Sequence, residues 1–309
     1  MKTHLLTRWA WPARFSPPPL VDEATLQHIY LAANSKLAPA LLAQREVQHI
    51  LLGERQSTFA GRGYEFAENQ LYSPGDEARF INWRVLARTG QMYRKTFYEE
   101  RRPPLWLLLD RGTSMRFGTR IRLKVAQAAQ LALFHLFLAQ RRSLLTGGVL
   151  LDEEPHWFAP SQDRGSQQAL IRQLCAACPP MPDTARGSGL PAILQQCQVQ
   201  LAPGCILILY SDFHELQVND MQLLHALAQQ HTVYACHIID VSEQSLPAHG
   251  EYHFAQGEDS TALDCNDAAL TSRYAQHMQQ RHTMLAEWFQ QAGIEYQLYR
   301  ADAELFGVP

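Results

Sequence analysis

Apolar segments that alternate with helix-like segments dominate the chain from residue 105 onward. Five short segments are almost entirely apolar, as buried strands of a parallel sheet are. These expected strands are residues 105–109, 144–151, 205–210, 232–239 and 294–299. The expected helices are residues 120–142, 166–177, 189–200, 219–230 and 267–291. This order predicts an α/β fold: a doubly wound, mostly parallel sheet with helices on both faces.

The first hundred residues follow a different pattern. Residues 50–102 contain short apolar or aromatic runs cut by glycine and proline, which is typical of strands and turns. Residues 1–49 combine a proline-rich stretch with a helical pattern over 21–42. The sequence therefore predicts three parts: an N-terminal arm with a helix (1–49), a small β-rich domain (50–104) and the α/β domain (105–309).

Composition and charge narrow the functional classes. The 309 residues are 46% hydrophobic, enough to fill a sizeable core, and the net charge of -3 gives no overall attraction for nucleic acid. We therefore expect no nucleic-acid partner. The N-terminus lacks the pattern of a signal peptide, and the longest apolar run, 125–139, falls short of the roughly 20 residues that cross a membrane. We expect no integral membrane segment and a cytoplasmic location.

Polar side chains stand at the ends of two expected strands and at the start of one helix. Asp110 ends the first strand and is followed by Ser114, Asp212 follows the third strand, and Ser188 precedes a helix. The carboxyl ends of parallel strands form the edge where α/β sheets bind ligands. Carboxylates and hydroxyls suit Mg²⁺. The other interpretation, that the aspartates only cap neighbouring turns or helices, stays open at this point.

Longer motifs resemble a known family. The stretch YSPGDEARFINWR (residues 72–84) with ARTG (87–90), preceded by GRGYEF (61–66) and followed by IDVSE (239–243), resembles the bacterial domain of unknown function 58 family. The resemblance covers roughly residues 50–300. The Asp110, Ser188 and Asp212 loops are similar to those of a von Willebrand factor type A domain, which implies a type A-like fold.

In that type A pattern these loops form a metal-ion-dependent adhesion site. The resemblance therefore implies a metal and partner-binding site at Asp110, Ser114, Ser188 and Asp212. Gly112 stands where the pattern Asp-x-Ser-x-Ser has its first serine, and Ser188 stands at the usual threonine. Because one hydroxyl ligand is lost, we expect at most a weak Mg²⁺ site.

The family resemblance also implies a function. Its members have no assigned enzymatic activity and are associated with MoxR-type AAA+ ATPases, so such an ATPase and its client proteins are the expected partners. The chain has no G-x-x-x-x-G-K-[ST] loop and is not that ATPase. Many relatives carry N-terminal membrane helices that are missing here, which implies a soluble form. We expect a non-catalytic protein-interaction scaffold or adaptor.

An enzyme of another class is the alternative. A metal-assisted phosphoester hydrolase could use the same carboxylates together with the seven basic residues of 79–102. The strand ends supply no evident general base, which disfavours this alternative. We interpret the basic cluster as pairing with nearby acids. The pair Cys175 and Cys178 is interpreted as buried small side chains, without a redox or metal role.

Overall fold

The chain forms two compact units, residues 1–44 with 104–309 and residues 45–103. This computed structural model describes residues 18–35, 60–61, 65–74, 77–98, 103–179, 189–247, 249–256 and 259–306. The larger unit holds the α/β sheet and the helix α1 (Glu23–Asn34), and the smaller unit holds a separate small sheet. Each unit is described by itself.

The larger unit is built on a six-stranded sheet in the order β11-β8-β7-β4-β5-β6. Its strands are β4 (Leu105–Asp110), β5 (Thr146–Leu151), β6 (Pro155–Ser161), β7 (Ile206–Ser211), β8 (Thr232–Ile239) and β11 (Glu295–Arg300). Every neighbouring pair is parallel except β5 and β6. The predicted doubly wound, mostly parallel sheet is therefore confirmed, with β4 and β7 at its centre.

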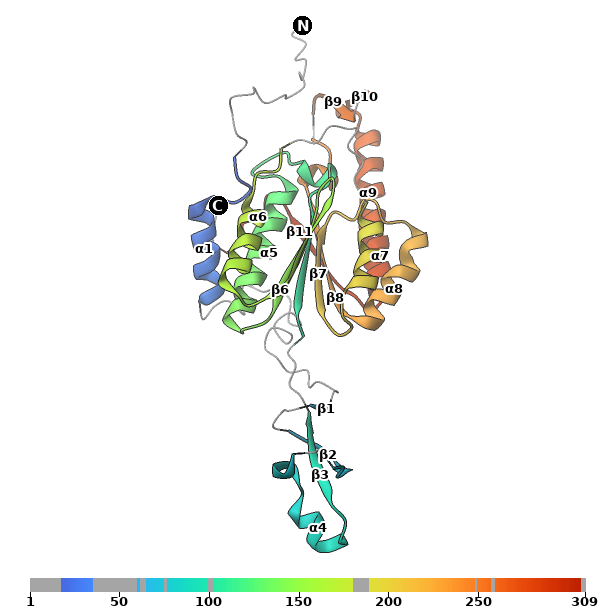
Figure 1. Ribbon diagram of the computed structural model, residues 1–309. Helices are drawn as coiled ribbons and strands as arrows, with labels where there is room; N and C mark the ends of the chain where they lie inside the picture. Colours follow the sequence, from blue (N-terminus) through green and yellow to red (C-terminus); the bar gives the residue numbers. More distant parts are fainter. Residues whose placement is uncertain are drawn as a thin grey trace. The chain divides into compact units, whose positions relative to one another are not determined.

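Helices cover both faces of this sheet (Figure 1). One face carries α5 (Lys124–Arg141) and α6 (Arg164–Cys175), with α1 packed on α5. The other carries α7 (Leu190–Gln200), α8 (Met221–Gln230) and α9 (Ala268–Gln291). Because both faces are covered, all six residues of β4 and of β7 are buried, and this explains their continuous apolar sequence.

Helix α5 is buried almost all round. All residues from Lys124 to Ala139 are buried, since the sheet covers one side and α1 the other, where Tyr30 makes an edge contact with Phe137. The longest apolar run of the chain is thus a core helix, as predicted. Within the described residues, no helix has the length and apolar character needed to cross a membrane.

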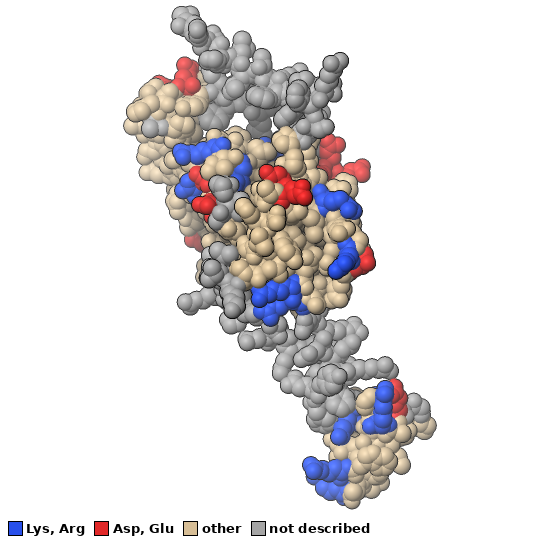
Figure 2. Space-filling view, turned by 90° about the vertical axis from the view of Figure 1, so that its left-hand side faces the viewer, with Lys and Arg blue, Asp and Glu red and all other residues tan. Residues whose placement is uncertain are grey.

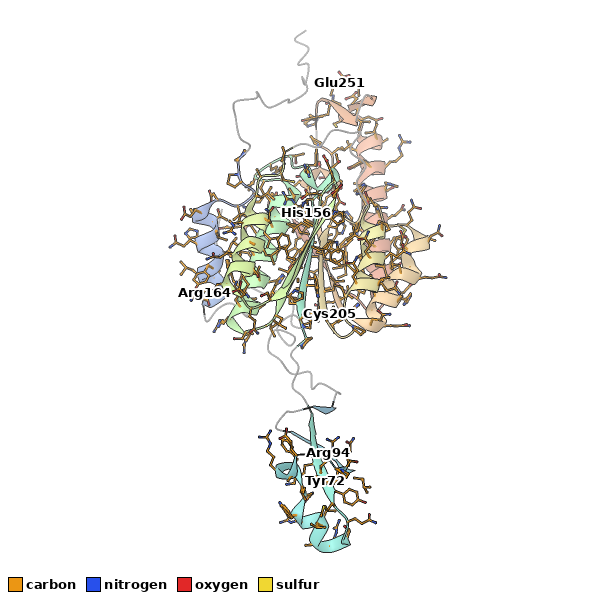
Figure 3. All side chains as sticks on the ribbon, viewed as in Figure 1. Tyr72, Arg94, His156, Arg164, Cys205 and Glu251 are labelled. Carbon is orange, nitrogen blue, oxygen red and sulfur yellow. The ribbon has the colours of Figure 1, made fainter. Side chains whose placement is uncertain are left out.

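Three strands of the larger unit were not predicted. Strand β6 is an antiparallel edge strand, where its prolines need not donate ladder hydrogen bonds. The strands β9 (Glu251–Gln256) and β10 (Asp259–Asp264) form an antiparallel hairpin. Glu251 marks this hairpin at one end of the larger unit, and Cys205, just before β7, marks the opposite, amino-terminal edge of the sheet (Figure 3).

The smaller unit contains the predicted strands and one helix that was not predicted. Its strands β1 (Ala60–Gly61), β2 (Glu65–Leu71) and β3 (Tyr93–Tyr98) form an antiparallel sheet in the order β1-β3-β2. Helix α4 (Trp83–Thr89) is capped by the Asn82 side chain, and it ends at Gly90, whose φ of 72° is a left-handed conformation that glycine adopts readily.

Basic side chains are spread over the surface of this unit (Figure 2). Arg79 pairs with Glu77 at 2.5 Å, and Arg94 donates a hydrogen bond to Gln70 at 3.0 Å. The acids and bases at 76 and 99–102 lie outside the described residues. The interpretation of the basic cluster as a set of local acid pairs therefore stays a prediction.

Candidate functional site

The two strand-end aspartates meet at the carboxyl-terminal edge of the sheet. Asp110 is the last residue of β4, Ser211 is the last residue of the neighbouring strand β7, and Asp212 follows it. The Ser211 hydroxyl donates a hydrogen bond to Asp110 Oδ2, so the two strand ends are joined directly. Asp110 and Asp212 therefore stand at neighbouring strand exits, and a shared binding site at these residues stays a prediction.

Asp110 is a poorly solvated carboxylate. Its exposure is 6%, and its oxygens accept hydrogen bonds from the Gly112 amide at 2.8 Å and from the Ser211 hydroxyl. Burial, reinforced by the negative charge of Asp212, raises the pKa of Asp110 to about 6 in spite of these hydrogen bonds. A group with this pKa changes protonation just below neutral pH.

Asp212 is equally buried, at 5% exposure, but it has cationic partners. Its Oδ2 lies 2.7 Å from Lys124 Nζ, and its Oδ1 accepts the His214 amide at 3.1 Å and lies 3.0 Å from His214 Nδ1. Burial alone would raise the pKa of Asp212, but the His214 hydrogen bond and the Lys124 charge hold it well below its usual range. The same hydrogen bond raises the pKa of His214.

Lys124 supplies the central cation of the site, and the sequence analysis missed it. Its side chain is 1% exposed, and Nζ lies 2.7 Å from Asp212 Oδ2 and 2.5 Å from Glu243 Oε1. Burial opposes the charge, but Asp212 and Glu243 outweigh it and raise the pKa of Lys124. One sequence signal existed: a lysine in the first turn of an apolar helix is unfavourable for the helix dipole and needs a partner elsewhere.

A third strand exit joins the network through the segment after β8. Asp240 accepts hydrogen bonds from the Thr119 amide at 2.9 Å and the Thr119 hydroxyl at 2.6 Å. Glu243 Oε2 accepts the Asp240 amide at 2.8 Å, which leaves Oε1 for Lys124. The family-like motif at 239–243 therefore ties the exits of β4, β7 and β8 together, a role that we had not assigned to it.

The other predicted site residues are placed as follows. Ser114 begins a short 3-10 turn, Ser114–Arg116, on the same loop as Asp110 and is partly buried. Ser188 lies outside the described residues. At Gly112, a Cβ atom would lie 3.0 Å from Asp110 Oδ1, so the glycine lets the backbone amide approach this carboxylate closely.

The described residues fit a divalent ion poorly. Among them there is no group of three or more His, Cys, Asp or Glu side chains arranged to hold a metal. Asp212, one of the two expected carboxylate ligands, is already bonded to an ammonium group at 2.7 Å. A Mg²⁺ ion on Asp212 would lie close to this positive charge, and their repulsion in a buried setting opposes binding.

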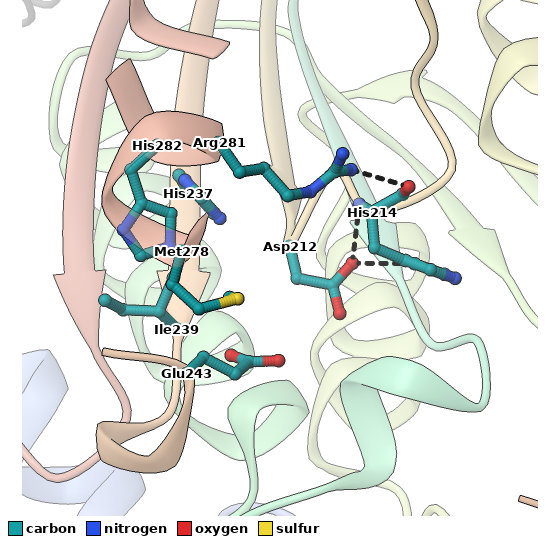
Figure 4. Close-up of a pocket in the computed structure, with 8 residues that line it drawn as sticks. All are labelled: Asp212, His214, His237, Ile239, Glu243, Met278, Arg281 and His282. Carbon is teal, nitrogen blue, oxygen red and sulfur yellow. Dashed lines mark hydrogen bonds and ion pairs between the residues drawn. The ribbon is translucent and has the colours of Figure 1, made fainter. Parts of the chain in front are cut away.

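A small cavity of about 40 Å³ opens beside Asp212 (Figure 4). Its polar lining comes from the exits of β7 and β8 and from α9: Asp212, His214, His237, Glu243, Arg281 and His282. Ile239 and Met278 complete it. Arg281 donates hydrogen bonds to the carbonyl oxygens of Phe213 at 3.1 Å and His214 at 2.6 Å, which holds the β7 exit against α9. In the described part of the chain, only one of the two aspartates, Asp212, lines this cavity.

A second polar cluster holds the C-terminal end of α6 and the residues just after it. Arg111, 5% exposed, donates hydrogen bonds to the carbonyl oxygens of Gln173 at 3.2 Å and Ala177 at 3.1 Å. Burial raises the pKa of the nearby Cys175 thiol to about 11. A thiol that is protonated at neutral pH is a poor nucleophile, which supports the interpretation of Cys175 as a packing residue.

Comparison with protein families finds one match. The family described as "Protein of unknown function DUF58" matches residues 68–284, more than half of the chain. Uncharacterized proteins of Mycobacterium bovis and Mycobacterium tuberculosis are 27% identical over 246 residues, which cover 78% of this chain and 77% of theirs.

Among solved structures, similar chains include an aerotolerance-related membrane protein from Bacteroides fragilis (TM-score 0.39, 11% identity, 64% of this chain and 91% of that one). The von Willebrand factor type A domain of SpRpn10 is another (TM-score 0.37, 13% identity, 66% of this chain and 91% of that one). The family match over residues 68–284 shows that the chain belongs to the DUF58 family of proteins of unknown function.

Proposed function

We propose that this chain is a non-catalytic protein-interaction module that receives an acidic group of a partner protein at the carboxyl-terminal edge of its sheet. The observation that carries the proposal is the charge network at three strand exits, where Lys124 is buried between Asp212 and Glu243. Buried ions and a carboxylate with a raised pKa cost folding free energy, and such groups concentrate at functional sites.

The partner that we propose is a MoxR-type AAA+ ATPase, which would act with this chain on client proteins in assembly or remodelling. The family resemblance supports this choice, and so does the lack of a phosphate-binding loop of its own. An adaptor of this kind needs a surface of fixed geometry. The hydrogen bonds among Asp110, Ser211 and Gly112 supply it at the end of β4.

Binding of the full chain to a purified MoxR-type ATPase, measured by biolayer interferometry, tests the proposal. Asp110→Asn removes one negative charge at the strand exits with little change of shape, and because this charge repels an acidic group, we expect the variant to bind more tightly than the wild type. Arg273→Gln, an exposed charge on α9, serves as the matched control and should bind like the wild type. If Asp110→Asn binds like the wild type, the strand exits are not the binding site. If the wild type does not bind, the ATPase is not the partner.

A weak Mg²⁺ site at Asp110, Ser114, Ser188 and Asp212 is the lesser form of the same proposal. The ion would bridge these oxygens to the acidic group of the partner. The Lys124 contact to Asp212 makes it the weaker choice. Isothermal titration with Mg²⁺ and Mn²⁺ tests this form. Binding heat in the wild type that disappears in Asp212→Asn would support the metal site. No binding heat in the wild type would rule the metal site out.

The hydrolase alternative gains one observation. His214 Nδ1 lies 3.0 Å from Asp212 Oδ1, so the pair has the geometry of a histidine general base with an orienting carboxylate, which the sequence analysis had not located. A screen of phosphomonoesters and phosphodiesters with added divalent metal tests this alternative. Turnover by the wild type that disappears in both His214→Gln and Asp212→Asn would favour the hydrolase over the non-catalytic module.

A further inference from the structure

The cavity beside Asp212 combines polar side chains from three elements with the apolar side chains of Ile239 and Met278. Figure 4 shows Arg281 and His282 reaching it from α9, and Asp212 and His214 from the end of β7. Its volume of about 40 Å³ accommodates roughly three water molecules, because one enclosed water needs roughly 10–15 Å³. One carboxylate group, with three heavy atoms, is of this size.

The carboxylates of the cavity are already bonded. Asp212 accepts from Lys124 through Oδ2 and from the His214 amide through Oδ1. Glu243 contacts Lys124 through Oε1 and accepts the Asp240 amide through Oε2. Each carboxylate oxygen therefore has a partner within the protein, and Lys124 balances part of their charge. Neither acid needs a ligand to satisfy it.

The uncommitted groups of the cavity are different in kind. His282 is 9% exposed, and neither of its ring nitrogens has a hydrogen-bond partner among the described residues. His237 is 2% exposed; its Nδ1 lies 2.6 Å from the Tyr296 hydroxyl, and its Nε2 has no partner in the described part of the chain. Burial lowers the pKa of both histidines, that of His237 to about 3, so each is neutral and carries one N–H group.

Arg281 adds a cation to these groups. One of its terminal nitrogens donates to the two carbonyl oxygens of the β7 exit, and no carboxylate of the described residues forms an ion pair with it. Its other N–H groups have no hydrogen-bond partner in the part of the chain that the structure describes. A cavity whose carboxylate oxygens are all bonded, and whose uncommitted groups include imidazole N–H donors and a cation, is complementary to an anionic acceptor.

We infer that this cavity binds the side-chain carboxylate of an aspartate or glutamate of a partner protein directly, through Arg281, His282 and His237, without a metal ion. The inference rests on the proposed function, in which a partner presents an acidic group, and it names the residues that receive that group. The contact of Arg281 with the β7 exit places this recognition next to Asp212.

The test uses the full chain with ¹⁵N-labelled histidine and follows the imidazole signals of His237 and His282 by NMR. The probe is N-acetyl-aspartate N-methylamide, which presents only a side-chain carboxylate, titrated in the presence of EDTA. N-acetyl-alanine, which presents a terminal carboxylate, and the neutral N-acetyl-asparagine N-methylamide are titrated in parallel at constant ionic strength. We expect saturable shifts with the aspartate probe and none with the asparagine probe.

Two variants and one control locate the binding. Arg281→Gln should weaken binding of the aspartate probe at least 10-fold, and Arg273→Gln, on the same helix, should leave it unchanged. Because Arg281 also anchors the β7 exit, Met278→Phe provides a second variant, which fills the cavity and leaves Arg281 in place. Urea unfolding verifies that each variant is folded. Retained binding in both Arg281→Gln and Met278→Phe would overturn the inference.

Three further outcomes separate the inference from the proposed function. If the aspartate probe gives no saturable shift while the ATPase binds, the inference fails and the proposed function stands. Tighter binding of N-acetyl-alanine than of the aspartate probe would overturn the assignment to a side-chain carboxylate in favour of a chain terminus. Weaker ATPase binding by both Met278→Phe and Arg281→Gln, with Arg273→Gln unaffected, would support both proposals.

Discussion

The exits of β4 and β7 carry the same residue in almost the same burial, yet their chemistry is opposite. Asp110 is 6% exposed and Asp212 is 5% exposed. Burial raises the pKa of Asp110 to about 6, whereas the His214 hydrogen bond and the Lys124 charge hold the pKa of Asp212 far below its usual range. Partners decide the difference: Asp110 has two neutral hydrogen-bond donors, and Asp212 has a buried ammonium group.

This contrast shows that a pair of strand-end aspartates need not act as equal ligands of one ion. Lys124 sits on Asp212 and also contacts Glu243, so a positive charge belonging to the chain already occupies one side of the site. Of the two aspartates, Asp110 is the one whose ionised form costs more folding free energy. Substitutions at Lys124, Asp110 and Gly112 should separate the effects of the cation, the buried charge and the backbone contact.

The largest effect is expected from removing the cation. Lys124→Met leaves Asp212 and Glu243 without their shared partner, and breaking a buried ion pair in this way costs about 3–5 kcal/mol. Urea unfolding at pH 7 measures the change in the free energy of unfolding. Arg273→Met, on the surface of α9, is the control, with an expected change within about 0.5 kcal/mol.

Asp212→Asn in the Lys124→Met background separates charge from packing. If the uncompensated charge causes the loss, the double variant should recover more than about 1 kcal/mol of it. Strictly additive losses would mean that Lys124 stabilises the fold only through the packing of its aliphatic chain.

A smaller effect of opposite sign is expected from Asp110→Asn. The pKa of Asp110 is about 6 in the folded protein against 3.8 in the reference state, so folding favours the protonated form. The contribution of Asp110 to the free energy of unfolding is complete below pH 3.8 and is lost as the pH rises through 6. At pH 7 to 8 the asparagine variant, which has no charge to bury, should be more stable than the wild type by about 1–3 kcal/mol.

The stability difference between Asp110→Asn and the wild type should depend on pH, and this dependence is the control. The advantage of Asp110→Asn should shrink toward zero near pH 4, which urea unfolding across pH 4 to 8 will show. Asp212 has the opposite sign, because its pKa is lowered: its contribution is present above pH 3.8 and is lost as the pH falls below that value. A stability difference that does not vary with pH would contradict the assignment to the Asp110 charge.

The smallest effect is expected at Gly112. A Cβ atom at this position would lie 3.0 Å from Asp110 Oδ1, a carboxylate that is held in place, so Gly112→Ser should cost about 1 kcal/mol, at the low end for an overpacked site. Thr113→Ser, at an exposed position of the same loop, is the control, with an expected change within about 0.5 kcal/mol. The measurement is the urea midpoint of both variants.

The same variant also tests whether a divalent ion can bind at Asp110 and Asp212. Gly112→Ser restores the serine that the adhesion-site pattern has, yet with Lys124 on Asp212 we expect 10 mM Mg²⁺ to add no stability. A Mg²⁺-dependent gain of more than about 1 kcal/mol would show that the ammonium group does not prevent a divalent ion from binding.

Some of this protein could be predicted from local patterns in the sequence. Buried parallel strands are continuous apolar runs, so β4, β7 and β8 were predictable, and with them the edge at which Asp110 and Asp212 meet. Strand β6 was not, because an edge strand tolerates proline and has no strict alternation. Helix α4, only seven residues long, gives too short a periodic signal.

What the sequence alone determined is the order of the parallel strands and the helices between them, and the two carboxylates at one edge. Tertiary structure decided their partners. Lys124 contacts Asp212, 88 residues away, and Glu243, 119 residues away, and the cavity combines the end of β7 with one face of α9. Periodicity reports only how residues close in sequence share a face, whereas the pKa of a buried group depends on charges brought near it by the packing of distant segments.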